Sequence, residues 1–197
     1  IATTRPETML GDGAVAVHPG DARYAPIVGR LVEIPVGPKE YRRLIPIITD
    51  EYPDPDFGSG AVKITGAHDF NDYQVAKRAG LPCYRLMDTR GRMRDDGAAY
   101  EVAVARAREI AAGSPTTEAE VDSLNLVPMK YRGLDRFEAR KAVIADINAI
   151  GLSVTVMISE IDPETGSEQL RLEPVVESKP IMQPFGDRSK VVIEPML

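Results

Sequence analysis

The stretch from residue 58 to residue 82 constrains the fold more than any other part of the sequence. Residues 61–65, A-V-K-I-T, alternate in the way expected of a strand with two different faces. A helix can follow over residues 69–79, because Gly80 suits a helix C-terminus and Pro82 prevents continuation. We therefore predict a strand, a tight turn and a helix in direct succession.

This geometry gathers polar side chains where the strand ends and the helix begins. They are Lys63, Thr65, His68, Asp69 and Asp72. The two aspartates also suit a purely structural role, since they occupy the N-cap and N3 positions of a near capping box. A cap requires neither Lys63 nor Thr65, so the combination favours a functional site, although a lone histidine is more often structural.

The same cluster contains the pattern H-D-x-x-D, which can also be read as a set of metal ligands. The chain has two histidines, His18 and His68, and one cysteine, so we do not expect a closed zinc site. A carboxylate site for magnesium stays open as an alternative. We assign no metal ligand.

Composition limits the possible classes of function. The chain has 197 residues, 43% of them hydrophobic, so we expect a single domain over residues 1–197 with a real core. The formal net charge of −6 argues against general attraction to nucleic acid phosphates, so any RNA contact must be local.

The sequence also carries signals about the cellular compartment. The single Cys83 excludes an internal disulfide, and no apolar run approaches the roughly 20 residues of a membrane span. We therefore expect a cytoplasmic protein. Because the chain starts at Ile1 inside what reads as a motif, we expect a piece excised from a longer protein.

The N-terminal stretch is the second informative region. Thr3, Thr4 and Thr8 surround Arg5, which Pro6 pushes toward extended geometry. Such threonines often bond only to their own local backbone. They equally form a set of hydroxyl and backbone donors around a small polar ligand.

Elsewhere, short strands alternate with turns. Strands are predicted at residues 14–17, 31–34, 45–49, 83–87, 153–159, 169–173 and 191–194, and helices at residues 99–112 and 137–150. Residues 153–184 should contain a projecting hairpin. The pattern predicts a mainly β protein, a β-rich α+β fold with a curved or closed sheet and peripheral helices.

The predicted helix over residues 137–150 has a clear start and an apolar face. Asp135 and Glu138 form a capping box ahead of it. Four apolar residues share one face and should cover a core: Val143, Ile144, Ile147 and Ile150.

Three motifs carry a resemblance to a known family. They read A-T-T-R-P-E-T-M-L-G-D at residues 2–12, G-A-V-K-I-T-G-A-H-D-F-N-D-Y at residues 60–73 and G-D-R-S-K-V-V-I-E-P-M-L at residues 186–197. The chain resembles the editing domain of the valyl-tRNA synthetase family, a connective peptide carried in the catalytic domain of these class I enzymes. Residues 88–184 match poorly, so no site residue is carried over from them.

Two positions depart from the family pattern. Gly66 replaces the proline that usually precedes A-H-D, and His18 replaces the asparagine that usually precedes Pro19. The first change should loosen the turn ahead of the predicted site.

The resemblance implies hydrolysis of the ester in threonyl-tRNA made for valine. By residue-to-residue match, Asp72 holds the α-ammonium of the substrate and Asp69, Lys63 and Thr65 complete the catalytic set. The substrate-binding set comprises Thr3, Thr4, Arg5, Glu7, Thr8 and His68; the threonine-rich peptide in it holds the terminal adenosine. None of these residues is a clear general base.

The resemblance also implies a fold, cofactors and partners. The fold is a closed six-stranded barrel with helices around it. The H-I-G-H and K-M-S-K-S signatures of the class I core are absent from the sequence, so no cofactor is expected, and ATP and magnesium belong to the parent enzyme. The expected partners are the 3′ end of tRNA(Val) carrying threonine and the rest of the parent synthetase, with no membrane and with the fragment as a monomer.

Two other classes of function remain open at this stage. One is a metal-dependent hydrolase that uses His68, Asp69 and Asp72 as ligands. The other is a non-catalytic tRNA-binding module.

Overall fold

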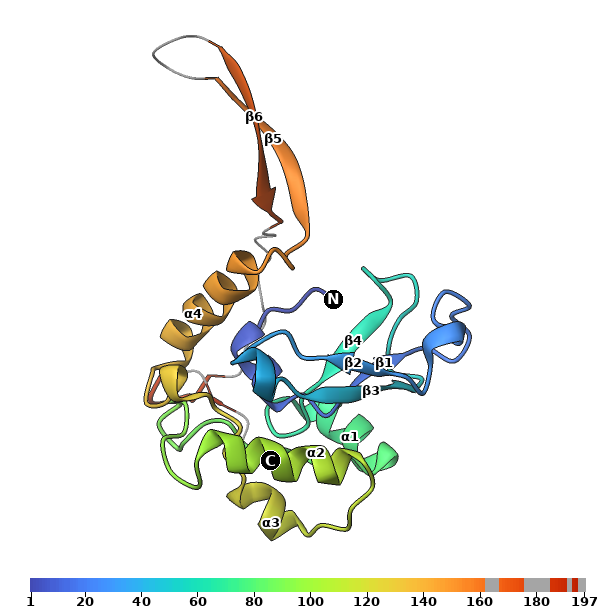
Figure 1. Cartoon of the computed structure of the whole chain (residues 1–197), viewed down its shortest axis with the longest axis vertical. Helices are drawn as coiled ribbons and strands as arrows, with labels where there is room; N and C mark the ends of the chain where they lie inside the picture. The colour runs from blue at the N-terminus through green and yellow to red at the C-terminus, as the bar shows by residue number, and fades with distance from the viewer. Residues whose placement is uncertain (162–166, 176–184, 191–192, 195–197) are drawn as a thin grey trace. The chain divides into compact units, whose positions relative to one another are not determined.

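A computed structural model describes residues 1–161, 167–175, 185–190 and 193–194 (Figure 1). The chain divides into two compact units. The first unit comprises Ile1–Val143 with Glu194–Leu197, and the second comprises Ile144–Ile193.

The first unit is built on a four-stranded mixed sheet. Its strands are β1 (Ala14–Val17), β2 (Leu31–Glu33), β3 (Leu44–Thr49) and β4 (Ala61–Ile64), in the order β2-β3-β1-β4. Strand β1 pairs in parallel with β3, with Val15 opposite Ile47, and antiparallel with β4, with Ala14 opposite Ile64. The four strands lie where the sequence predicts strands, since each is a short β-branched run between turn residues.

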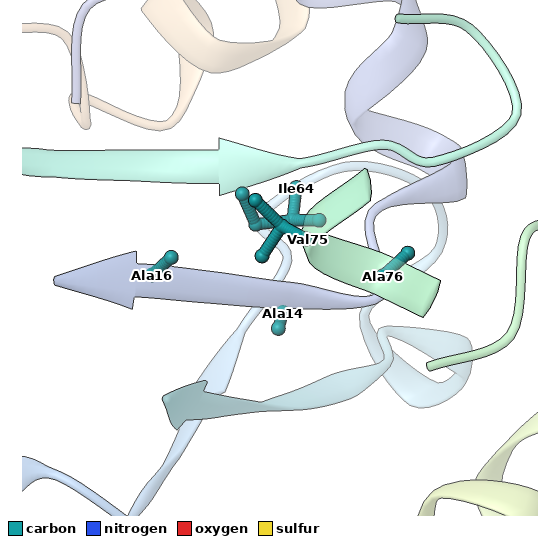
Figure 2. Close-up of a cluster of buried hydrophobic side chains, with 5 residues drawn as sticks. All are labelled: Ala14, Ala16, Ile64, Val75 and Ala76. Carbon is teal, nitrogen blue, oxygen red and sulfur yellow. The ribbon is translucent and has the colours of Figure 1, made fainter. Parts of the chain in front are cut away.

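Helix α1 (Phe70–Ala79) covers β1 and β4 and completes the predicted strand, turn and helix. Figure 2 shows Val75 and Ala76 of this helix against Ala14 and Ala16 of β1 and Ile64 of β4, and all five side chains are buried. The helix ends at Gly80, whose φ of 64° is a left-handed conformation that suits glycine. This packing anchors the first turn of α1 next to the end of β4.

The remaining helices follow α1 along the chain. They are α2 (Tyr100–Ala111), α3 (Glu118–Ser123) and α4 (Arg136–Ala149), with short 3-10 turns η1 (Pro6–Gly11), η2 (Ala25–Ile27), η3 (Lys39–Tyr41) and η4 (Met129–Tyr131). Helix α4 begins in the first unit and ends in the second. The prediction of α2 is confirmed, and α3 begins after Thr117, whose hydroxyl accepts a hydrogen bond from the backbone N–H of Glu120.

Helix α4 starts at the predicted capping box but does not have the predicted core face. The Asp135 carboxylate accepts from Phe137 N at 2.9 Å, and the Glu138 carboxylate accepts from Asp135 N at 3.3 Å. Val143 is buried, whereas Ile144 and Ile150 are exposed. Val143 is the last residue of the first unit in this helix, whereas Ile144 and Ile150 belong to the second unit.

The second unit contains an antiparallel hairpin in the predicted region. Strand β5 (Thr155–Ile161) pairs with β6 (Glu168–Pro174), and Met157 lies opposite Leu172. The turn predicted between them falls on residues 162–166, outside the described part of the chain.

The predicted closed six-stranded barrel is wrong. The described residues form a four-stranded mixed sheet and a separate two-stranded sheet. The prediction of a mainly β protein is wrong as well, because helices accompany these strands and the content is mixed α/β. The predicted strand at residues 83–87 does not form; Met87 makes only an isolated bridge to Met93. Its apolar pattern has another cause, because Tyr84, Leu86 and Met87 are buried side chains of an irregular segment. The predicted strand at residues 191–194 falls largely outside the described residues.

Candidate functional site

Lys63 on β4 is the centre of a cluster of polar side chains in the first unit. Its Nζ donates to Thr8 Oγ1 at 2.9 Å, to Asp12 Oδ1 at 3.5 Å and to Thr65 Oγ1. The ammonium has three protons, and these three oxygens account for them. Thr8 comes from η1, more than 50 positions away in sequence, so the fold joins the threonine-rich peptide to the end of β4.

Asp12 is a buried carboxylate that sequence reasoning did not select. It follows η1, is 2% exposed, and its Oδ1 accepts from the Thr65 hydroxyl. Burial raises the pKa of the Asp12 carboxyl, against the lowering effects of Lys63, Thr65 and Arg43. The available signal was its position as the last residue of the A-T-T-R-P-E-T-M-L-G-D motif.

Arg43 fixes the backbone on which Asp12 stands. Its guanidinium donates to the carbonyl oxygens of Leu10 at 2.6 Å and Asp12 at 3.0 Å, and it lies over the Tyr84 ring, 5.2 Å from the centroid. The side chain is buried, which lowers the pKa of Arg43. The cluster therefore contains a buried cation, Arg43, besides the partly exposed Lys63.

Asp72 turns its carboxylate toward the strand rather than toward its own helix. Its Oδ2 accepts from the backbone N–H of Thr65 at 2.8 Å. The residue is buried, and burial raises the pKa of the Asp72 carboxyl to about 6, although the Thr65 N–H and Lys63 lower it. Thr65 is thus held by Asp12 at its hydroxyl and by Asp72 at its backbone.

Asp69 performs the capping role that the sequence offered to both aspartates. Its Oδ1 accepts from Asn71 N at 2.8 Å and from Asp72 N at 3.1 Å, and its backbone is extended as an N-cap residue requires. The structural role is therefore real for Asp69, while the hydrogen bond of Asp72 serves the turn before the helix.

The threonine-rich peptide is held mainly through Arg5 and Glu7. Both Glu7 carboxylate oxygens accept from Arg140 of α4 at 2.8 Å, and Glu7 is fully buried. Arg5 donates from Nη1 to His68 O at 2.8 Å, and Thr8 Oγ1 donates to Arg5 O at 2.9 Å. These contacts fix the path of the peptide beside the turn after β4.

The threonines at the start of this peptide differ from Thr8 in burial. Thr3 is partly exposed and its hydroxyl accepts from Arg5 N at 3.1 Å, while Thr4 is exposed. The structure therefore brings Lys63, Thr65 and Thr8 into direct contact and leaves Thr3 and Thr4 at the surface.

His68 is enclosed by the protein. Its Nε2 accepts from Leu86 N at 2.9 Å, so in the neutral ring the proton is on Nδ1, which faces Glu194 Oε1 at 3.5 Å. The side chain is 1% exposed, and burial lowers the pKa of the imidazole. Glu194 also pairs with Arg5, so these contacts account for His68 as a link between the turn and the chain near residue 194.

Both departures from the family pattern have a local physical account. A Cβ on Gly66 would stand 2.5 Å from Cys83 Sγ and 2.8 Å from Ala76 Cβ. A side chain at this position would therefore clash with these two neighbours, whereas glycine fits. His18 Nδ1 accepts from Gly20 N at 3.1 Å, a bond to the second following residue that asparagine side chains also make.

Two surface clefts are lined by residues other than Asp12, Lys63, Thr65 and Asp72. One, of about 600 Å³, is lined by Pro19, Thr49, Asp50, Glu51, Tyr52 and Arg78, and the other, of about 440 Å³, by residues of β2, β3 and the end of α2. The chemical cluster is instead a compact hydrogen-bonded arrangement. Lys63, with a side chain 11% exposed, and Asp69 are its partly exposed members.

Two features are absent from the described residues. These residues contain no group of three or more His, Cys, Asp or Glu side chains arranged to hold a metal ion. No helix within this part of the chain is long and apolar enough to cross a membrane.

Comparison with known proteins gives a consistent result along the whole chain. No protein-family model matches it. The chain is 67% identical over 205 residues to a valine–tRNA ligase of Ruegeria pomeroyi and 42% identical over 197 residues to one of Dechloromonas aromatica. Both matches cover all of this chain, which spans 20% and 15% of the length of those relatives.

The comparisons first define a class: this chain is homologous to part of an aminoacyl-tRNA synthetase. More particularly, it is homologous over its full length to a segment of valine–tRNA ligases, which confirms the resemblance to the valyl-tRNA synthetase family. The assignment of individual site residues stays a prediction.

Proposed function

We propose that the chain is the editing domain of a valyl-tRNA synthetase and hydrolyses the ester of threonyl-tRNA(Val). The observation that carries this proposal is the junction of Thr8 with Lys63 and Thr65, across more than 50 residues of sequence. It unites the threonine-rich motif and the A-V-K-I-T-G-A-H-D motif, the two stretches on which the resemblance rests.

The chemistry of the site suits an α-aminoacyl ester. An Asp72 carboxyl with a pKa of about 6 is ionised at neutral pH and can accept hydrogen bonds from an ammonium group. Asp69 and Lys63 are the partly exposed groups beside it. A polar site of this kind would distinguish threonine from valine, because valine would leave buried polar groups unpaired, at roughly 1–3 kcal/mol each.

A second, hydrolytic site is useful because an apolar binding pocket separates valine from threonine poorly. Threonine and valine have the same shape, and the established figure for a valine-selective apolar pocket is a preference of only about a hundredfold. Hydrolysis at a second site that binds the hydroxyl removes the remaining error. The proposed partners are accordingly the 3′ end of tRNA(Val) and the rest of the synthetase, and the proposed compartment is the cytoplasm.

The direct test measures deacylation of Thr-tRNA(Val) and Val-tRNA(Val) by this chain and by a full-length ligase that contains it. We expect the full-length enzyme to clear Thr-tRNA(Val) much faster than Val-tRNA(Val). Equal rates for the two esters would contradict the proposal. Binding of both without hydrolysis would favour a non-catalytic RNA-binding module.

A chelator separates this proposal from a metal-dependent hydrolase. Because His68 is enclosed and its Nε2 accepts from the backbone, it is poorly placed as a ligand beside Asp69 and Asp72. A small aminoacyl ester avoids the magnesium that tRNA needs in order to fold. Hydrolysis of such an ester should survive EDTA. Loss of activity that zinc or manganese restores would favour the metal enzyme.

A further inference from the structure

Asp12 stands behind the residues to which the proposed function assigns a role. Its Oδ1 accepts from Thr65 Oγ1 and lies 3.5 Å from Lys63 Nζ. The Asp12 side chain is 3% exposed, compared with 11% for Lys63. A substrate therefore meets Lys63 first, and Asp12 acts from the interior.

Counting protons shows what Asp12 controls. A threonine hydroxyl has one proton, and that of Thr65 is committed to Asp12. Lys63 donates to the same hydroxyl, so Thr65 Oγ1 has a lone pair but no proton left for any further group. The orientation of this hydroxyl and the position of the ammonium thus both depend on one buried carboxylate.

Asp12 also compensates a charge. Burying an ammonium group costs free energy unless an opposite charge lies beside it. The Asp12 carboxylate forms a salt bridge to the partly buried Lys63. Arg43 holds the Asp12 and Leu10 carbonyl oxygens, so the carboxylate stands on a fixed backbone. The arrangement is therefore preorganised rather than formed when a ligand arrives.

We propose that Asp12 is a positioning residue of the deacylation site, which fixes the Thr65 hydroxyl and neutralises Lys63 so that both stand in one geometry beside Asp72. The inference rests on the proposed function for its effect on hydrolysis. Its effect on the charge around Asp72 does not depend on that function.

The first test uses a full-length ligase that contains this chain. Asp12→Asn, which keeps the shape and removes the charge, should lower kcat/KM for Thr-tRNA(Val) about 100-fold, the scale expected for a misplacement of about 1 Å. Asp21→Asn is the matched control, because Asp21 is also buried but pairs with Arg23. A folded Asp12→Asn enzyme with wild-type kcat/KM would overturn the proposal.

A double-mutant cycle separates positioning through Thr65 from a general loss of structure. Thr65→Val removes the hydroxyl at nearly constant volume. If Asp12 acts through that hydroxyl, Asp12→Asn should cost much less in the Thr65→Val background than in the wild type. Full additivity of the two losses would contradict the proposal.

The second readout uses this chain alone and needs no deacylation. The charged or titratable groups that act on Asp72 are Lys63, Asp69, Asp12 and Tyr52. Asp12→Asn removes a like charge and leaves Lys63 without its paired carboxylate, so the pKa of Asp72 measured by NMR should fall. An unchanged or raised pKa would contradict the proposal, whatever the full-length enzyme does.

A measurement on the wild-type chain covers the case in which Asp12→Asn does not fold. A hydroxyl proton buried in a hydrogen bond to Asp12 should exchange slowly with water and give an NMR correlation between Thr65 and the Asp12 carboxyl carbon. A rapidly exchanging Thr65 hydroxyl would refute the contact. Absence of selective Thr-tRNA(Val) hydrolysis with this contact present would instead refute only the proposed function.

Discussion

The polar cluster of the first unit buries polar side chains, whereas the hairpin of the second unit exposes apolar ones. In the first unit, Glu7, Asp12 and Thr65 are at most 2% exposed. In the hairpin, Met157, Leu170 and Leu172 are more than 60% exposed. The comparison teaches that burial here follows the available partners rather than the polarity of the residue.

Different interactions stabilise the two regions. Buried polar groups persist only when hydrogen bonds replace water, and the cluster supplies them from Arg140, Lys63 and Arg43. The hairpin is instead held by its backbone ladder. Its register puts Met157 and Leu172 on one face, while Arg171 on the other face pairs with Glu160 and Glu173.

The largest expected effect comes from matched arginine substitutions in the two regions. Arg140→Ala removes both 2.8 Å hydrogen bonds of the fully buried Glu7 and leaves it the longer contact with Arg5 Nε at 3.4 Å, so the free energy of unfolding should fall by about 3 kcal/mol. Arg171→Ala removes two exposed ion pairs, with Glu160 and Glu173, and should cost about 1 kcal/mol or less. Urea denaturation of both variants measures the difference, and equal losses would break the comparison.

Asp72→Ala tests whether the cluster is functional as well as structural. Losing a charge-assisted bond to the substrate ammonium costs roughly 1.5–3 kcal/mol, and misplacement of the ester adds more, so Thr-tRNA(Val) deacylation in a full-length ligase should fall at least about 100-fold. Mischarged product should accumulate while valine activation stays nearly unchanged.

Asp69→Ala gives the stability reference for that experiment. Asp69 accepts two N–H groups at the helix start, so its loss should cost about 1 kcal/mol of stability. An Asp72→Ala enzyme that is folded by circular dichroism and clears Thr-tRNA(Val) at the wild-type rate would reduce Asp72 to a structural residue.

The pH dependence of stability reports the burial of Asp72. Its folded pKa of about 6 lies above the ordinary value of 3.8, so between about pH 4 and 6 the folded state binds more protons than the unfolded state. Stability therefore falls as the pH rises through this window. Asp72→Asn removes this contribution, so it should stabilise the chain by about 2 kcal/mol more at pH 7 than at pH 4. Denaturation at both pH values, with Asp69→Asn as the comparison, checks the sign.

The smallest expected effect lies in the hairpin. Leu172→Ala removes an exposed side chain and should change stability by about 0.5 kcal/mol or less. Ile64→Ala in the buried core is the positive control and should cost about 2–5 kcal/mol. A loss of several kcal/mol from Leu172→Ala would show that the exposed face is packed in solution.

Much of the local structure could be predicted because its causes lie within a few residues. The strand at residues 61–64, the cap at Asp69 and the end of α1 at Gly80 follow from alternation, capping and backbone conformation. The segment at residues 83–87 was mispredicted because a buried apolar run looks the same whether or not it joins a sheet.

The sequence alone was enough to predict the order of these elements, the grouping of Lys63 with Thr65 and Asp72, and the homology to valine–tRNA ligases. It did not predict Thr8 and Asp12 as partners of Lys63. Only the tertiary structure decided the sheet order, which replaces the expected barrel, and the partners of each buried charge. Asp12 joins Thr65, and Arg140 joins Glu7 across 133 positions. The physical reason is that a hydrogen bond between distant residues leaves no periodic trace in the sequence, whereas a helix or strand repeats its pattern along the chain.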